Sequence, residues 1–277
     1  MKTKLLICLV LVLCCLCGCT VQESDNTKTE LPKQKQTDNI KGVWISFSEL
    51  DLMLNSNDFK IEFEAAAEKM QSAGITDAYI HTRAFADAIY KSELFPQRVT
   101  AEKDFDVLEY MIDVCHQKNI RFHAWINPYR IKTSDSDITT LSPFGTVYGW
   151  LTDQNTENDN NVLISNGLYL NPASSEVRRL IIDGVREILS DYKVDGIHFD
   201  DYFYPDNAPA NVDRATYLKN NPRKLSQNDW RRNNVTTLIQ STGARRHPQR
   251  KHRQQVSALM NQRRQQAGYR QAIGLAE

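Results

Sequence analysis

The chain has 277 residues, 41% of them hydrophobic, with 34 basic and 34 acidic residues and six cysteines. This apolar content excludes a wholly disordered chain and is sufficient for a packed domain. Five cysteines lie at or before Cys19 and only Cys115 follows, which excludes a disulfide framework in the body of the chain.

The first residues predict export. Lys2 and Lys4 precede an apolar run over residues 5–16, which is too short to span a membrane as a helix. Residues 1–18 are therefore expected to be a signal peptide. Residues 16–19, Leu-Cys-Gly-Cys, resemble a bacterial lipobox, and that resemblance implies a lipid on Cys19 and attachment to the membrane of the cell envelope. A plain signal peptide or an uncleaved anchor is the alternative.

Residues 19–40 are polar and contain few large apolar side chains. Such a segment buries too little surface to fold, so we expect a disordered tether between the lipid and a domain that begins near Lys41.

From residue 42 to residue 241, short apolar runs alternate with longer amphipathic stretches. The runs predict strands over residues 42–47, 75–82, 120–126 and 194–199. The amphipathic stretches predict helices over residues 58–74, 104–119 and 174–192, with a further amphipathic segment over 227–241.

This alternation predicts an α/β fold with a parallel sheet and right-handed crossovers. A doubly wound sheet and a (β/α)₈ barrel of the TIM type both fit. No glycine-rich loop follows the first strand, which weighs against a nucleotide-binding fold. Polar and aromatic residues follow each successive strand, as they do at the carboxyl-terminal face of a barrel. We therefore favour a barrel, present only as about its first four β/α units in residues 41–241.

The segment "VDGIHFDDYFYP" carries the predicted chemistry. Asp200 stands at the tip of the fourth strand, where a carboxylate can act as a nucleophile, a charge stabiliser or a general acid. Asp201 is expected to hold a substrate hydroxyl or to orient His198. The alternative is that the two adjacent acids only cap a loop.

Side chains at the other strand ends complete the predicted site. The expected substrate-binding residues are Arg83, His123, Asn127, Arg130, His198 and Tyr202. Alternatives remain open for two of them, a salt bridge for Arg83 and a satisfied core position for His123. Trp125 is expected to pack rather than to form a platform. No H-x-H or H-E-x-x-H pair is present, so neither a metal nor another cofactor is predicted.

Several motifs together resemble the glycosyl-hydrolase-like 10 family of bacterial (β/α)₈ proteins. They are "KGVWISF", "AYIHTRAFADAIYKSELFP", "FHAWINPYRI", "LYLNPASSEVRRLIIDGVREIL", "YKVDGIHFDDYFYP" and "DWRRNNV". The resemblance implies hydrolysis of a glycosidic bond, with one branch of the family acting on peptidoglycan glycan strands that lack stem peptides. "DGIHFD" also resembles the D-G-x-R-x-D strand motif of α-amylases, which implies a nucleophilic Asp200, although His198 replaces the arginine.

The end of the chain differs from its body. Residues 242–277 hold eight Lys and Arg, seven Gln and a single acid, so the rest of the chain is acidic. No further strand is predicted there. Because family members continue into a second half of the barrel, this basic tail indicates a frameshift or a truncated gene.

Three hypotheses follow. The first is an enzyme, a surface-tethered glycoside hydrolase acting on cell-wall or other polysaccharide. The second is a non-catalytic carbohydrate-binding lipoprotein, and the third is an inactive truncated fragment. The acidic body favours a neutral glycan, and nucleic acid is not an expected partner.

Overall fold

The structure is a computed structural model that describes residues 40–50, 52, 55–98, 104–200, 203–205, 208–243 and, as backbone, 255–258. The predicted signal peptide, Cys19, the tether, Asp201, Tyr202 and most of the basic tail lie outside these residues. No helix in the described part of the chain has the length and apolar character needed to cross a bilayer.

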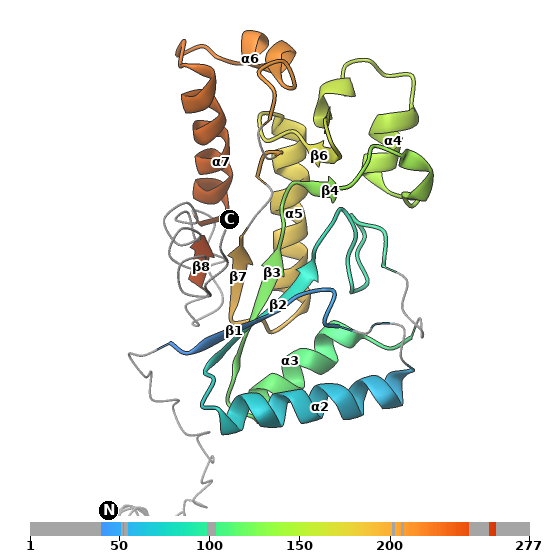
Figure 1. Cartoon of the computed structure of the whole chain (residues 1–277), viewed down its shortest axis with the longest axis vertical. Helices are drawn as coiled ribbons and strands as arrows, with labels where there is room; N and C mark the ends of the chain where they lie inside the picture. Colours follow the sequence, from blue (N-terminus) through green and yellow to red (C-terminus); the bar gives the residue numbers. More distant parts are fainter. Residues whose placement is uncertain are drawn as a thin grey trace, which may run out of the picture. The chain divides into compact units, whose positions relative to one another are not determined.

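The centre of the fold is a parallel sheet in which strands follow one another in chain order (Figure 1). It contains β1 (Gly42–Ile45), β2 (Asp77–Arg83), β3 (Arg121–Ile126), β7 (Gly196–Phe199) and β8 (Gln255–Ala258), in the order β1-β2-β3-β7-β8. A doubly wound sheet reverses its strand order at a switch point, and this sheet does not. Sequential parallel order is that of a TIM-type barrel, which the described strands leave unclosed.

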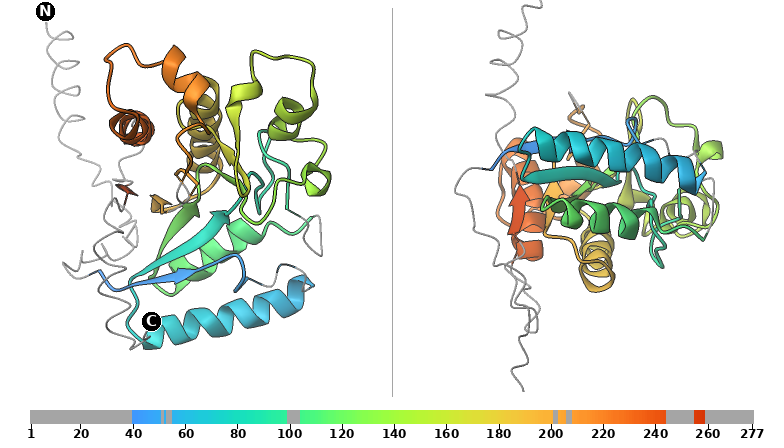
Figure 2. Two further views of the ribbon diagram at one scale, coloured as in Figure 1. Left: turned by 45° about the horizontal axis from the view of Figure 1, so that its top comes forward. Right: turned by 90° about the horizontal axis from the view of Figure 1, so that it is seen from below.

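Helices connect the strands and cover one face of the sheet. They are α2 (Ser56–Ser72), α3 (Val107–Gln117) and α5 (Ser175–Asp191), and Figure 2 shows them next to the strands that they connect. The face they cover is apolar, because Ile80, Ala124 and Ile197 share one register row and are each at most 1% exposed. Burial of these residues against the apolar faces of the helices provides the main stabilisation.

The helix boundaries follow the local chemistry read from the sequence. Ser174 caps α5, with its hydroxyl accepting from the backbone N–H groups of Glu176 and Val177. Gly74 follows α2 with a φ of 71°, a conformation in which a side chain would be strained. The predicted four strands and main helices are confirmed, with ends shifted by a few residues.

The long polar segment between β3 and α5 is more structured than predicted. It contains β4 (Arg130–Lys132), η1 (Ile138–Thr140), α4 (Thr146–Thr152), η2 (Asp159–Asn161), β5 (Val162–Ile164) and β6 (Leu168–Leu170). Its strands form an antiparallel sheet in the order β4-β6-β5. Three-residue strands are too short to show a periodic pattern, so the sequence did not reveal them.

After β7 come α6 (Arg214–Lys219) and α7 (Gln227–Gly243), and then β8. The backbone of β8 pairs in parallel with β7, with Val256 opposite Ile197. The prediction that no further strand follows residue 241 is therefore wrong. The segment Gln-Val-Ser-Ala contains one large apolar residue, which is insufficient to mark a strand in the sequence.

Candidate functional site

The uncovered face of the sheet is lined by aromatic rings and imidazoles. One register row contains Trp44, Tyr79 and His123, and the next row toward the strand ends contains His81, Trp125 and His198. Trp44 Nε1 lies 3.2 Å from His198 Nε2, although β2 and β3 separate their strands. Three strand spacings in a flat sheet are about 14 Å, so this contact shows that the sheet curls and that this face is concave.

Asp200 occupies the predicted position at a strand end. Ile126 pairs with Phe199, so Asn127 and Asp200 are the next residues on two neighbouring parallel strands. Asp200 is partly exposed, whereas Asn127 is 2% exposed. The structure therefore brings Asp200, Asn127 and the upper row of the concave face to one edge of the sheet.

His198 is held as a neutral donor beneath Asp200. The Trp44 indole can only donate, so His198 Nε2 accepts and the proton of neutral imidazole lies on Nδ1. Burial, together with the nearby His123, lowers the pKa of His198 to about 4. Nδ1 is buried without a hydrogen-bond partner in the described part of the chain.

His81 is also neutral and stands at the end of β2. Its Nδ1 accepts from the Phe47 backbone N–H at 3.1 Å, and its ring stacks on Trp125. Burial, followed by the charge of Arg130, lowers the pKa of His81 to about 3. A neutral imidazole stacked on an indole is suited to hydroxyl groups rather than to an anion.

His123 lies lower on the concave face than predicted. Its Nε2 is 2.7 Å from Asp77 Oδ1, and Asp77 is also bound by Arg121 at 2.6 Å. Burial opposes ionisation of Asp77, but the hydrogen bonds from His123 and Arg121 outweigh it and hold the pKa of this carboxyl well below its usual value. His123 thus supports Tyr79, on which it stacks, one row below the strand ends.

Arg83 does not join the strand-end group. The register between β2 and β3 shifts between His81 and Arg83, so Arg83 pairs with Ile126 and faces the helices. Its guanidinium stacks on Phe95 at 3.9 Å and lies against Gly184 of α5. At 1% exposure it has no access to a substrate, and the expectation that it binds one is not supported by its position.

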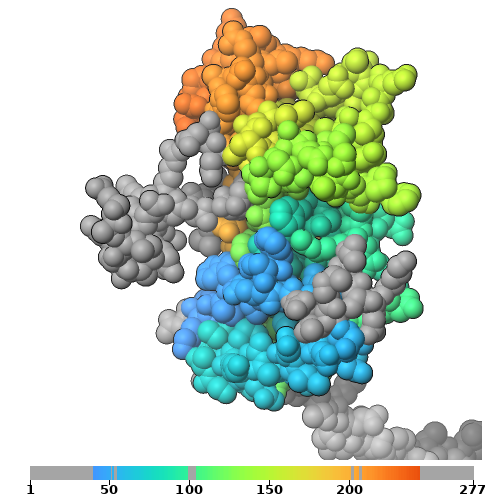
Figure 3. Space-filling model, turned by 45° about the vertical axis from the view of Figure 1, so that its right-hand side comes forward, coloured from blue at the N-terminus to red at the C-terminus, as the bar shows by residue number. Residues whose placement is uncertain are grey.

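A second cluster adjoins the concave face at the ends of β1 and β2. Phe47 and Phe85 pack edge to face with centroids 5.0 Å apart, and Arg98 and Arg130 lie over both rings. Arg130 is 6% exposed, and its Nε donates to the Ala84 carbonyl at 2.5 Å. Figure 3 shows the segment after β1, in blue, and the loop after β2, in teal, on one face of the molecule.

Asp87 is the carboxylate of this cluster. It lies 4.0 Å from Arg98, and burial raises its pKa despite the neighbouring arginines. Burial thus favours the protonated form of this carboxyl group near the end of β2. Asp87 was not among the site residues predicted from the sequence, because no residue spacing marks it as a second acid.

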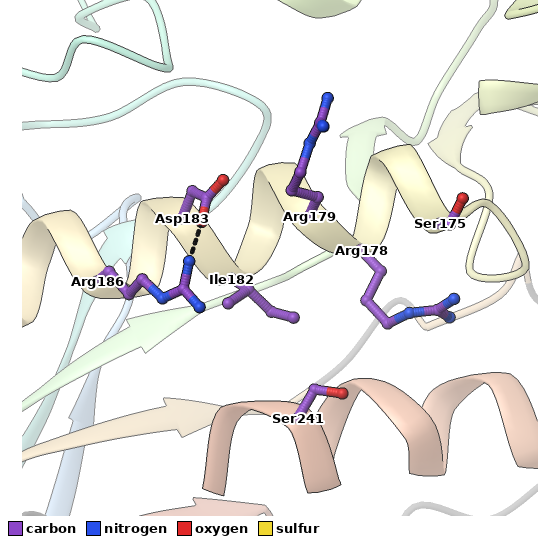
Figure 4. Close-up of a pocket in the computed structure, with 7 residues that line it drawn as sticks. All are labelled: Ser175, Arg178, Arg179, Ile182, Asp183, Arg186 and Ser241. Carbon is purple, nitrogen blue, oxygen red and sulfur yellow. Dashed lines mark hydrogen bonds and ion pairs between the residues drawn. The ribbon is translucent and has the colours of Figure 1, made fainter. Parts of the chain in front are cut away.

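A hollow on the opposite side of the sheet does not belong to this site. It measures about 430 Å³ and lies between α5 and α7 (Figure 4). Its lining is Ser175, Arg178, Arg179, Ile182, Asp183, Arg186 and Ser241, with Arg186 bound to Asp183. These side chains line the outer helices and include none of the predicted site residues.

The chemistry of the concave face is that of a site for a hydroxylated ring. Neutral imidazoles donate to or accept from hydroxyls, indole rings offer flat apolar surfaces, and Asp200 supplies negative charge. Among the described residues, no three His, Cys, Asp or Glu side chains are arranged to hold a metal ion. Trp44 and Trp125 were not predicted as site residues, although period-two alternation with His81 and His198 could have placed them on this face.

The fold and this face define an α/β protein of the TIM-barrel type with a polar and aromatic site at its strand ends. The chain belongs to the family described as Glycosyl hydrolase-like 10, whose model matches residues 39–247. The predicted family is thus confirmed.

Two curated relatives are similar over much of the chain. "Glycosyl hydrolase YngK" of Bacillus subtilis is 30% identical over 217 residues, covering 72% of this chain and 41% of the relative. "Glycosyl hydrolase DigH" of Escherichia coli is 26% identical over 263 residues, covering 86% of this chain and 60% of the relative. The chain therefore spans about half the length of these relatives.

Among solved structures, an α-L-fucosidase isoenzyme 2 from Paenibacillus thiaminolyticus shares the fold. Its TM-score is 0.52 with 16% sequence identity, and the alignment covers 80% of this chain and 32% of that chain. At this identity the likeness concerns the fold alone, and it agrees with a barrel of which the described strands form a part.

Proposed function

We propose that this chain binds a polysaccharide at the carboxyl ends of β1, β2, β3 and β7 and supplies Asp200 to hydrolysis of a glycosidic bond. The observation that carries the proposal is the register of β3 and β7. It sets Asp200 and Asn127 side by side directly above the imidazoles and indoles of the concave face. Glycoside hydrolysis uses a pair of carboxylates, and Asp200 would be the nucleophile or charge stabiliser of that pair.

We propose peptidoglycan glycan strands without stem peptides as the substrate. The resemblance of the sequence to a family with a branch that acts on this substrate supports this choice, and family membership supports a carbohydrate ligand in general. The test is to incubate the full chain with purified denuded strands and to measure new reducing ends. Binding without new reducing ends would favour a carbohydrate-binding protein. The absence of both binding and cleavage would contradict the proposal.

We also propose that Cys19 carries a lipid that holds the protein in the cell envelope. The charged start, the short apolar run and the Leu-Cys-Gly-Cys segment support it. Cells fed labelled palmitate should label the wild-type chain, and Cys19→Ala should abolish the label and release the protein from the membrane fraction. Cys115→Ala is the matched control, because this buried thiol lies in α3. Equal labelling of wild type and Cys19→Ala would contradict lipid attachment.

A further inference from the structure

The cluster of Phe47, Phe85, Arg98 and Arg130 concentrates positive charge beside the proposed sugar site. The Arg98 guanidinium carbon lies 5.2 Å from the centroid of each ring, and that of Arg130 lies 5.4 Å and 4.3 Å from them. Both guanidinium groups therefore lie against one pair of rings. Stacking on an aromatic face leaves the in-plane N–H donors of a guanidinium directed toward another acceptor.

Arg98 has unused donor capacity in this position. Its Nη1 is buried and has no hydrogen-bond acceptor in the described part of the chain. Among the described residues, the carboxylate that pairs with Arg98 is Asp87, whose Oδ2 lies 4.0 Å from Arg98 Nε, which is long for a charge-assisted hydrogen bond. The Arg98 side chain as a whole is 28% exposed, so a ligand can reach the guanidinium group from solvent although Nη1 itself is buried. A buried guanidinium donor without an acceptor is costly unless a bound group satisfies it.

The cluster is continuous with the sugar site through two residues. Phe47 packs against His81 with centroids 5.7 Å apart, and its backbone N–H donates to the same imidazole. The positive charge of Arg130 also contributes to the lowered pKa of His81. A ring held over the upper row of the concave face would therefore place a neighbouring sugar, or one of its substituents, near the two guanidinium groups.

We infer that Arg98 and Arg130 bind a carboxylate carried by an acidic sugar of the polysaccharide. The inference rests on the proposed function and specifies its substrate class further. A planar carboxylate accepts paired N–H donors from guanidinium groups, whereas a sugar hydroxyl would leave the charge uncompensated. The overall acidic body favoured a neutral glycan, but the local charge beside the site is positive. Local charge decides recognition because distant charges are screened within about 8 Å in physiological salt.

The carboxylate could belong to a uronic acid or to a lactyl ether on an amino sugar. The experiment compares equilibrium binding of the full chain to three probes: denuded peptidoglycan strands, the same strands with carboxylates reduced to alcohols, and oligogalacturonate. Native strands should bind about tenfold or more tightly than reduced strands. Tighter binding of oligogalacturonate than of native strands would support a carboxylate site and assign it to a uronic acid.

Two substitutions separate this role from folding. Arg98→Gln should abolish the preference for native over reduced strands and leave binding of reduced strands unchanged, and Arg98→Lys should restore part of the preference. Arg186 is an exposed arginine on α5, and the control Arg186→Gln should retain the full preference for native strands. Equal binding of native and reduced strands by the wild-type chain would overturn the inference and leave the proposed function standing. Failure to bind any probe would overturn both.

Discussion

Asp200→Asn is expected to reduce the rate of glycan cleavage by about 10³-fold or more while leaving glycan binding within about twofold of wild type. Asparagine keeps the shape of the side chain and removes the negative charge and the nucleophilic oxygen. Because the proposed role of Asp200 is in the transition state, the loss should fall on kcat rather than on KM.

Asp183→Asn is the matched control for this substitution. Asp183 is a carboxylate on α5, bound to Arg186 and remote from the strand ends. The Asp183→Asn protein should cleave glycan at the wild-type rate. Thermal unfolding of all three proteins checks that the substitutions leave the fold intact. Cleavage at the wild-type rate by the Asp200→Asn protein would show that Asp200 takes no part in the reaction.

Acid is expected to destabilise the fold through two buried histidines. The pKa of His81 is lowered to about 3 and that of His198 to about 4, chiefly by burial, whereas unfolded histidine titrates near about 6.5. The unfolded chain therefore binds more protons as pH falls below about 6.5, and the stability conferred by neutral imidazoles is progressively lost. From about pH 7 to about pH 4.5, the two groups together should cost about 5 kcal/mol of unfolding free energy.

Denaturant unfolding over this pH range measures the effect. Asp87 contributes with the opposite sign, because its raised pKa favours the folded state as pH falls. The comparison of wild type with His198→Asn isolates one imidazole and should show a shallower pH dependence. A wild-type stability that does not change between these pH values would contradict the proposed burial of neutral histidines on the concave face.

The regular β/α units could be predicted because apolar periodicity and helix caps are local properties. Ser174 and Gly74 marked helix ends in the sequence and do so in the structure. The position of Asp200 followed from the same reasoning, since a residue just after a parallel strand lies at the carboxyl edge of the sheet.

Three features could not be predicted in this way. The register shift between His81 and Arg83 reverses the alternation, and it depends on pairing with β3 rather than on residues of β2 alone. The antiparallel sheet of β4, β5 and β6 consists of strands too short to show a period. The guanidinium groups of Arg98 and Arg130 come from the loop after β2 and from the start of β4, two segments that the fold brings together.

The central claim is that a sugar binds on the concave face with Asp200 at its reactive edge. The most direct test is a crystal structure of the Asp200→Asn protein with a denuded glycan fragment. The account predicts a sugar ring against Trp44 and the strand ends, with an oxygen within about 3 Å of the side chain at position 200. A fragment bound only in the hollow between α5 and α7, with the concave face empty, would contradict it.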